Sequence, residues 1–259
     1  MQDSRKLRYY TKRGLGARRN WFSNWSITNW LILINVIFFV FVMILFPPVS
    51  KIIEGVRVLT LNPFVVNNIA LSWNNIAELR VWTFLTSMFM HAPGGFLSIF
   101  SFHLLINMFV LFSLGNLSEK IIGKKRFLWF YLISGLIAGA MFVLLAYFFG
   151  GSDLGARIFG SPEIAAVGAS GAIFAIAGLF MILTPRLRFM IIFFPFFSLP
   201  AYIMIPLVLF GTWIVSYYAQ FGVGNTAHFG GFLAGVIYGL YLRNKYKRKT
   251  QMIANYFSR

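Results

Sequence analysis

Two side chains of the sequence, Ser170 and His228, form a combination that can carry out covalent acyl transfer. Ser170 stands in the tetrapeptide GASG, residues 168–171, where neighbours without bulky side chains let a substrate backbone approach. A serine hydroxyl becomes a nucleophile when a base accepts its proton, and His228 is the only histidine after residue 103. The pair predicts a nucleophile and a general base without a third, acidic member.

His103 and Asn107 add two hydrogen-bond donors to this set. They are four residues apart, so in a helix they share one face. Each side chain can donate a hydrogen bond. Interhelical packing is the alternative interpretation, because polar side chains also join helices in membrane proteins.

The composition decides what kind of element must hold these residues. Of 259 residues, 59% are hydrophobic and 11% charged, whereas a soluble domain is about 45–50% apolar. Several uncharged runs exceed the roughly 18 residues that indicate a membrane-spanning helix. The sequence therefore predicts an all-α membrane protein that crosses the bilayer several times.

Six spans account for the apolar runs, with a long interfacial loop over residues 49–95 between the first two. The 54 residues from 189 to 242 are uncharged and too long for one crossing, so we place a turn at the sequence QFGVGNT, residues 220–226. We divide the chain into a basic segment 1–26, a membrane domain 27–242 and a basic tail 243–259. The predicted spans are 27–46, 96–117, 127–149, 164–183, 190–219 and 227–242.

The net charge of +17 indicates the orientation of these spans. An even number of spans puts both termini on one side, and 19 of the 23 basic residues then lie on that side. By the positive-inside rule that side is the cytoplasm, so we predict a multi-pass protein of the cell membrane with both termini cytoplasmic. The same distribution favours contact with membrane lipids over a nucleic-acid partner.

Under this topology the candidate residues reach a similar depth. The second, fourth and sixth spans run inward from the outer face; they carry His103 and Asn107, Ser170, and His228 near their outer ends. Small residues at four-residue intervals favour close packing of the sixth span against the fourth, which would bring His228 toward Ser170. The GASG tetrapeptide could serve packing alone, and His228 could simply bond a neighbouring helix. The shared depth of a serine, a histidine and two donors favours chemistry.

Other kinds of site lack the residues they need. The sequence has no cysteine, no H-E-x-x-H motif, and no Asp or Glu inside a predicted span. We therefore expect neither a cofactor nor a bound metal. His91, just before Ala92-Pro93, is interpreted as an exposed loop residue or a structural hydrogen-bonding residue.

Four segments, in order, resemble the rhomboid family of intramembrane serine proteases over about residues 78–242. They are ELRVWTFLTSMFMHA, HLLINM, GASGAIF and AHFGGFLAG. The resemblance implies a six-helix rhomboid-like bundle with Ser170 as nucleophile and His228 as its base. It implies His103, Asn107 and the Ser170 N–H as oxyanion donors, Gly168 and Gly171 as supporting residues, and Phe174 as the ring against the catalytic imidazole. It also matches Glu119 to an acidic position after the second span, and it departs from the family at Trp82-Thr83, where a Trp-Arg pair is typical.

The resemblance implies a serine endopeptidase that cleaves transmembrane protein substrates near the outer face of the bilayer. A non-catalytic rhomboid-like scaffold or chaperone would keep the fold, but it would have no use for Ser170 and His228 together. A small-solute transporter would more often show repeated halves and intramembrane charge, and neither is visible in the sequence.

Overall fold

Helices occupy all six predicted spans in the computed structural model, which describes residues 25–53, 56–94, 101–191, 194–219 and 224–257. They are α2 (Ile27–Leu45), α6 (Phe102–Ile122), α7 (Lys124–Phe149), α9 (Ser170–Leu183), α10 (Ala201–Ala219) and α11 (Asn225–Lys245). Of these, α2, α6, α7 and α10 are long and apolar enough to cross a membrane. The prediction of an all-α membrane protein is confirmed, while the count of six crossings stays a prediction. The basic segment 1–26 lies almost wholly outside the described residues.

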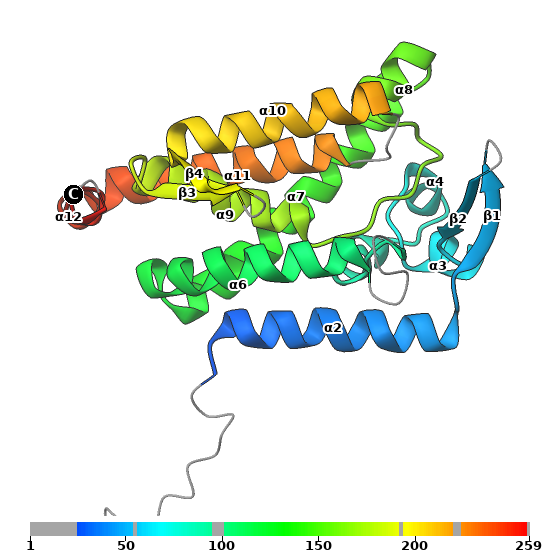
Figure 1. Cartoon of the computed structure of the whole chain (residues 1–259), viewed down its shortest axis with the longest axis horizontal. Helices are drawn as coiled ribbons and strands as arrows, with labels where there is room; N and C mark the ends of the chain where they lie inside the picture. The colour runs from blue at the N-terminus through cyan, green and yellow to red at the C-terminus, as the bar shows by residue number, and fades with distance from the viewer. Residues whose placement is uncertain (1–24, 54–55, 95–100, 192–193, 220–223, 258–259) are drawn as a thin grey trace, which may run out of the picture.

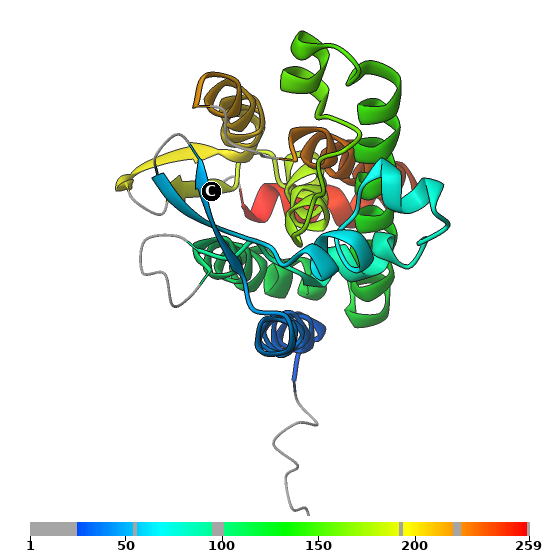
Figure 2. The same ribbon diagram turned by 90° about the vertical axis from the view of Figure 1, so that its right-hand side faces the viewer.

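Helix α9 lies in the middle of the bundle, where it contacts α6, α7, α10 and α11 (Figure 2). Its apolar side chains are buried almost throughout, whereas α2 lies at one side against α6 (Figure 1). The backbone N–H and the hydroxyl of Thr28, in the first turn of α2, both donate to Glu119 Oε2 of α6, at 3.0 and 3.2 Å. A carboxylate at a helix N-terminus is favoured by the helix dipole, so this contact fixes α2 on α6.

The close contact of α9 with α11 depends on glycine. A Cβ added at Gly231 would overlap the carbonyl oxygen of Gly171, and one at Gly235 would overlap that of Ala175. Small residues allow the two backbones to approach within the distance that larger side chains would prevent. The predicted packing of the fourth span on the sixth is confirmed, and it places the start of α11 beside the start of α9.

The predicted loop between the first two spans is a compact layer of short elements at the end of the molecule opposite helix α12 (Figure 1). Strands β1 (Val49–Ile53) and β2 (Val56–Thr60) form an antiparallel pair, with Val49 opposite Thr60. Helices α3 (Pro63–Asn68), α4 (Trp73–Ala77), α5 (Thr83–Thr86) and the 3-10 helix η2 (Ser87–Phe89) follow.

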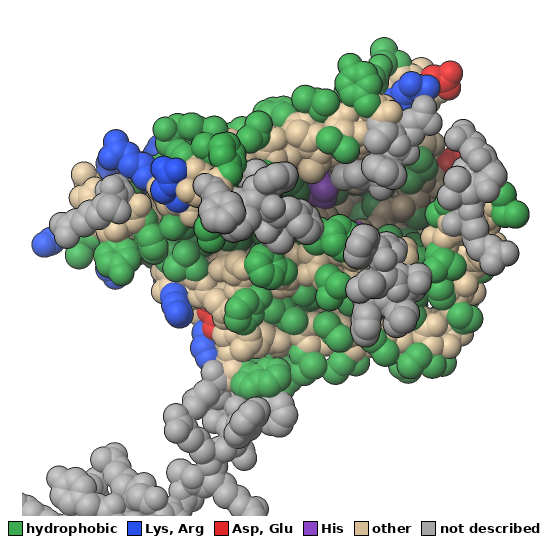
Figure 3. All heavy atoms as spheres, viewed as in Figure 1, with side chains coloured by type: hydrophobic (Ala, Val, Ile, Leu, Met, Phe, Trp, Pro, Cys, Tyr) green, Lys and Arg blue, Asp and Glu red, His purple; other side chains and the backbone are tan. Residues whose placement is uncertain are grey.

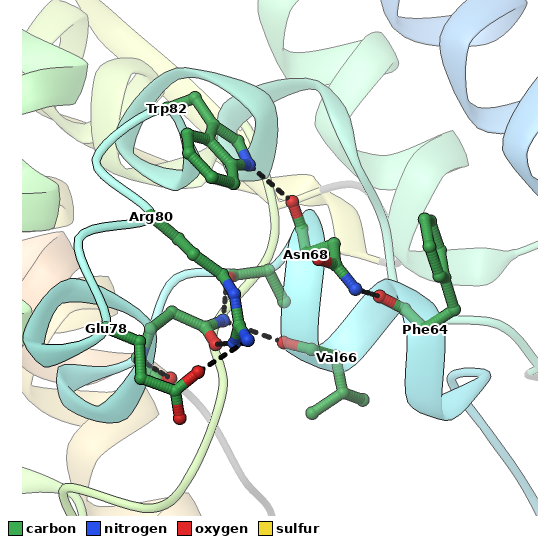
Figure 4. A network of polar contacts seen from close by, with 9 residues as sticks. Phe64, Val66, Asn68, Glu78, Arg80 and Trp82 are labelled. Carbon is green, nitrogen blue, oxygen red and sulfur yellow. Dashed lines mark hydrogen bonds and ion pairs between the residues drawn. The ribbon is translucent and has the colours of Figure 1, made fainter.

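Polar contacts join α3 and α4 to the segment between α4 and α5 (Figure 4). Trp82 Nε1 donates to the carbonyl oxygen of Asn68 at 2.8 Å, and Arg80 Nη1 donates to Asn75 Oδ1 at 3.0 Å. Arg80 also forms an ion pair with Glu78. The chain has Thr83 after Trp82 instead of the arginine of the typical Trp-Arg pair. Arg80, two residues before Trp82, takes part in this network instead.

The structure corrects several of the predicted boundaries, of which three bear on the site. The fourth span begins at Ser170 instead of 164, because the segment before it is extended: Ala166 pairs with Leu71, between α3 and α4, and Gly168 bonds to Ser87 of η2. The second span extends to Ile122, so Glu119 lies within α6. The fifth span begins at Ala201, since the residues described before it form the antiparallel strands β3 (Arg188–Ile191) and β4 (Phe194–Pro200). Aromatic and β-branched residues there favour strands, and the prolines disfavour a helix.

Two further helices lie outside the predicted spans. Helix α8 (Asp153–Phe159) lies in the predicted loop between the third and fourth spans. Helix α12 (Lys247–Tyr256) lies in the predicted basic tail, and α11 itself continues past residue 242 to Lys245.

Candidate active site

The extended segment before α9 places Ser170 at the first position of that helix. Leu71 and Ala166 exchange backbone hydrogen bonds of 2.8 and 2.9 Å, and the Gly168 N–H donates to the Ser87 carbonyl at 2.8 Å. Gly168 has φ of +132°, a conformation that side chains rarely adopt, and it directs the chain into the helix. Because the first N–H groups of a helix have no partner within it, the Ser170 N–H is placed to bind a ligand.

His228 lies within hydrogen-bond distance of Ser170. Its Nε2 is 2.8 Å from Ser170 Oγ, and it stands in the first turn of α11. The Phe174 ring, one turn along α9, stacks on the imidazole with ring centres 4.5 Å apart and an interplanar angle of 25°. His228 Nδ1 is buried and has no hydrogen-bond partner among the described residues. The stacked ring therefore holds the imidazole in place where an acidic third residue would otherwise do so.

His103 lies on the other side of Gly168. A Cβ added to Gly168 would stand 2.8 Å from His103 Cε1, 3.0 Å from His103 Nε2 and 3.6 Å from Ser170 Oγ. Only a glycine fits between the imidazole and the serine at this point. Asn107 Nδ2, one turn further along α6, donates to the His103 carbonyl at 2.8 Å, which leaves the second amide hydrogen unassigned.

The backbone N–H of Ala92 determines which nitrogen of His103 carries a proton. This N–H donates to His103 Nδ1 at 3.2 Å, so Nδ1 is an acceptor and the neutral ring must be protonated at Nε2. Ser101 Oγ donates to the Ala92 carbonyl, so the peptide groups on both sides of Ala92 are hydrogen-bonded. The Nε2–H that faces Gly168 is therefore a hydrogen-bond donor.

One cavity joins these residues. It has a volume of about 1610 Å³, and Ser170, His228, His103 and Asn107 all line it. Much of the remaining wall consists of apolar side chains, from α6, α7, α10 and the segment before α9. Leu187, Arg188, Phe189 and Met190, at and just before β3, also line it. Figure 3 shows a histidine side chain within a hollow of this face.

The sequence model of the Rhomboid domain family matches residues 78–245, which are about two thirds of the chain and include all of the proposed catalytic residues. The chain belongs to the rhomboid family. It is 31% identical to RHOMBOID-like protein 5 of Arabidopsis thaliana over 179 residues, which are 68% of this chain and 50% of that protein. It is 29% identical to RHOMBOID-like protein 12, mitochondrial, of the same plant over 178 residues, 65% of this chain and 48% of that protein. The chain spans about half the length of both relatives.

The structure brings the predicted site residues of this rhomboid together. Ser170 and His228 share a hydrogen bond, Phe174 stacks on His228, and Gly168 separates Ser170 from His103. Gly171 contacts α11 at Gly231 and α7 at Ala138. Within the described ranges, no group of three His, Cys, Asp or Glu side chains is arranged to hold a metal ion.

The sequence did not indicate a buried pair behind His103. His91 is fully buried, and its Nε2 lies 3.0 Å from Asn35 Oδ1 of α2. Asn35 Nδ2 donates to the Leu31 carbonyl at 2.7 Å, so Oδ1 is the acceptor and His91 Nε2 the donor. The His91 ring also meets the His103 ring edge-on, with centres 5.2 Å apart. Of the two interpretations of His91, the structural hydrogen-bonding residue is confirmed.

Burial keeps His91 neutral. Burial, and to a smaller extent the nearby His103, lowers the pKa of His91 to about 3. The imidazole therefore acts as a fixed donor to Asn35 at physiological pH, with its Nδ1 lacking a partner in the described structure.

Proposed function

We propose that this rhomboid is an intramembrane serine endopeptidase with a Ser170/His228 dyad. The observation that carries the proposal is the distance of 2.8 Å between His228 Nε2 and Ser170 Oγ, with Phe174 stacked on the same imidazole. A base within hydrogen-bond reach of the hydroxyl is the geometry that nucleophilic catalysis requires.

The proposed reaction proceeds through an acyl-enzyme. Ser170 Oγ attacks the scissile carbonyl carbon while its proton passes to His228 Nε2, and the same proton then goes to the leaving amine as the C–N bond breaks. Water attacks the resulting ester and gives a proton to His228, which returns it to Ser170 Oγ as the ester C–O bond breaks and the new carboxyl end is released. His228 is thus base and acid in turn, and Nδ1 carries the second imidazole proton throughout.

The oxyanion of each tetrahedral intermediate has three candidate donors in this proposal. They are the Ser170 N–H at the start of α9, the His103 Nε2–H and the free amide hydrogen of Asn107. Donors held in place before the reaction stabilise negative charge that develops only in the transition state. The Ala92 N–H supports this role, since it directs the His103 proton to Nε2.

The cavity supports a membrane-embedded polypeptide as the substrate. Its volume of about 1610 Å³ exceeds the roughly 300–1,000 Å³ of small-molecule sites, and its walls beyond the polar residues are mostly apolar. We infer that a transmembrane segment of another protein enters between α6 and α10 and is cleaved near the outer face. The proposal places the protein in the cell membrane with both termini in the cytoplasm. Figure 1 is consistent with termini on one side, since α2 begins and α11 ends at the same end of the molecule.

A serine-directed fluorophosphonate probe tests the dyad without a known substrate. The purified protein is expected to be labelled at Ser170, because its activated Oγ attacks the phosphorus of the probe and displaces fluoride. Ser170→Ala is expected to abolish labelling, and His228→Ala to slow it strongly by removing the base. A wild-type protein that stays unlabelled while folded would favour the alternative, a non-catalytic rhomboid-like scaffold or chaperone.

A further inference from the structure

The end of the molecule where α11 meets α12 carries cations around two tyrosine rings. Lys245 Nζ lies 5.2 Å from the ring centre of Tyr241 and 5.7 Å from that of Tyr246. Arg126 Cζ, in the first turn of α7, lies 5.6 Å from the centre of the same Tyr246 ring. Lys245 Nζ also donates to Tyr241 OH at 2.7 Å. Two positive groups from different helices therefore approach one ring.

No carboxylate of the described residues forms an ion pair with Arg126 or Lys245, since the ion pair found there joins Glu78 to Arg80. Glu119 is buried in α6 and accepts hydrogen bonds from Thr28. Helix α8, which carries Asp153, lies at the opposite end of the molecule (Figure 1). Like charges that share a site repel each other, and a bound anion removes that cost.

Helix α12 adds an apolar face bordered by further cations. Lys247, Arg248 and Lys249 begin it, and Figure 3 shows Lys and Arg side chains gathered at this end of the molecule. Arg248, Met252 and Tyr256 are spaced four residues apart and share one helix face. Met252 is 65% exposed and Tyr256 75% exposed. A short helix with exposed apolar side chains and flanking cations is typical of the membrane interface.

We propose that this end of the molecule is a binding site for an anionic phospholipid, whose phosphate lies between Arg126 and Lys245 while α12 lies in the membrane interface. The exposed Met252 and Tyr256 favour a lipid over a soluble anion, because only a lipid brings acyl chains that cover them. The site lies where α7 begins and α11 ends, at the level expected for headgroups. This inference is independent of the proposed protease activity.

Lipid retention by the purified full chain tests the site. In phosphatidylcholine nanodiscs with or without phosphatidylglycerol, native mass spectrometry is expected to show preferential retention of phosphatidylglycerol by the wild type. The double variant Arg126→Gln/Lys245→Gln is expected to lose about fivefold in that preference for each cation removed. The matched control Lys51→Gln/Arg157→Gln removes two exposed cations elsewhere and is expected to keep the wild-type preference, as is Arg126→Lys.

The outcomes separate the possible ligands. Equal retention of the two lipids by the wild type, or equal losses in the double variant and its control, would overturn the proposal. Displacement of phosphatidylglycerol by inorganic phosphate would also overturn it and indicate a soluble-anion site. Since the chain has no cysteine, Met252→Cys with a nitroxide label gives a second measurement. The label is expected to be accessible to membrane-dissolved oxygen, and accessibility only to an aqueous quencher would contradict the placement of α12.

Discussion

The backbone N–H of Ala92 donates to His103 Nδ1 at 3.2 Å, which makes the opposite nitrogen of that imidazole the one that carries hydrogen. Ala92 follows His91 directly, and His91 is anchored to Asn35 of α2 by a buried hydrogen bond of 3.0 Å. The orientation of a proposed oxyanion donor on α6 therefore depends on a peptide that is held from a different helix.

His91→Phe is expected to lower turnover per folded molecule by roughly tenfold, less than the loss of a whole oxyanion donor. Phenylalanine keeps a ring at this buried position but cannot donate to Asn35, so the Ala92 peptide loses its anchor. The measurement is turnover of a model transmembrane substrate, corrected for the folded fraction.

A double-mutant cycle with His103→Ala distinguishes positioning from general destabilisation. If His91 acts through His103, then His91→Phe has no further effect on turnover once His103 is alanine. Asn35→Leu/His91→Phe replaces both partners by apolar groups, so it is expected to restore stability but not turnover. Additive losses in the cycle would remove His91 and Asn35 from the mechanism.

The stability of the fold is expected to fall in acid because of His91. Its pKa is about 3 in the folded protein and about 6.5 when unfolded, so the unfolded chain takes up the proton first as the pH drops. The corresponding stability is fully present above about pH 6.5 and is lost toward pH 3, by about 1.4 kcal/mol per pH unit. Free energies of unfolding in mixed detergent measure this loss. In His91→Phe the free energy of unfolding is expected to fall less steeply with decreasing pH, by the contribution of one proton. Equal slopes for the wild type and His91→Phe would show that the pKa of His91 is not lowered by folding.

Asn107→Ala is expected to lower turnover by about 10- to 1,000-fold with little change in substrate binding, if the amide donates to the developing oxyanion. A packing role predicts something different, a destabilisation of about 0.6 kcal/mol with normal turnover per folded molecule. Steady-state kinetics and thermal unfolding of the same preparation separate the two results.

Gly231→Ala is expected to destabilise the contact of α9 with α11 and to reduce activity in proportion. The added Cβ would overlap the Gly171 carbonyl oxygen, and both atoms are fixed to helix backbones that cannot move freely. Gly211→Ala of α10 is the matched control, because a Cβ there meets nothing within 4 Å. The control is expected to be neutral or to gain up to about 1 kcal/mol from helix propensity. Equal unfolding temperatures for the two variants would mean that α9 and α11 can move apart without loss of stability.

The helices and the serine–histidine pair could be predicted from the sequence because their signals are local or periodic. Apolar runs predict the helices, and small residues at four-residue spacing in the sixth span predict the packing that brings His228 to Ser170. The start of the fifth span, predicted at residue 190, was wrong because an uncharged apolar run suits a strand as well as a helix. Residues 188–191 and 194–200 pair as β3 and β4 instead.

The surroundings of His103 could not be predicted in the same way. The His91–Asn35 contact joins residues 56 positions apart, and Ala92 contributes only a backbone N–H, which no residue type reveals. The start of α9 at Ser170 likewise follows from the pairing of Leu71 with Ala166, a contact between distant segments. Asn35 gave one local signal, since it is a polar residue within an otherwise apolar span.

Cleavage of a single-span membrane protein by the purified, reconstituted chain tests the proposed protease activity most directly. The wild type is expected to produce a new pair of ends within the outer part of the substrate's apolar segment, identified by mass spectrometry. Ser170→Ala, which removes only the hydroxyl that lies 2.8 Å from His228 Nε2, is expected to give no product while its helicity and unfolding temperature stay unchanged. Product formed at an undiminished rate by the folded Ser170→Ala protein would contradict a serine mechanism at this site.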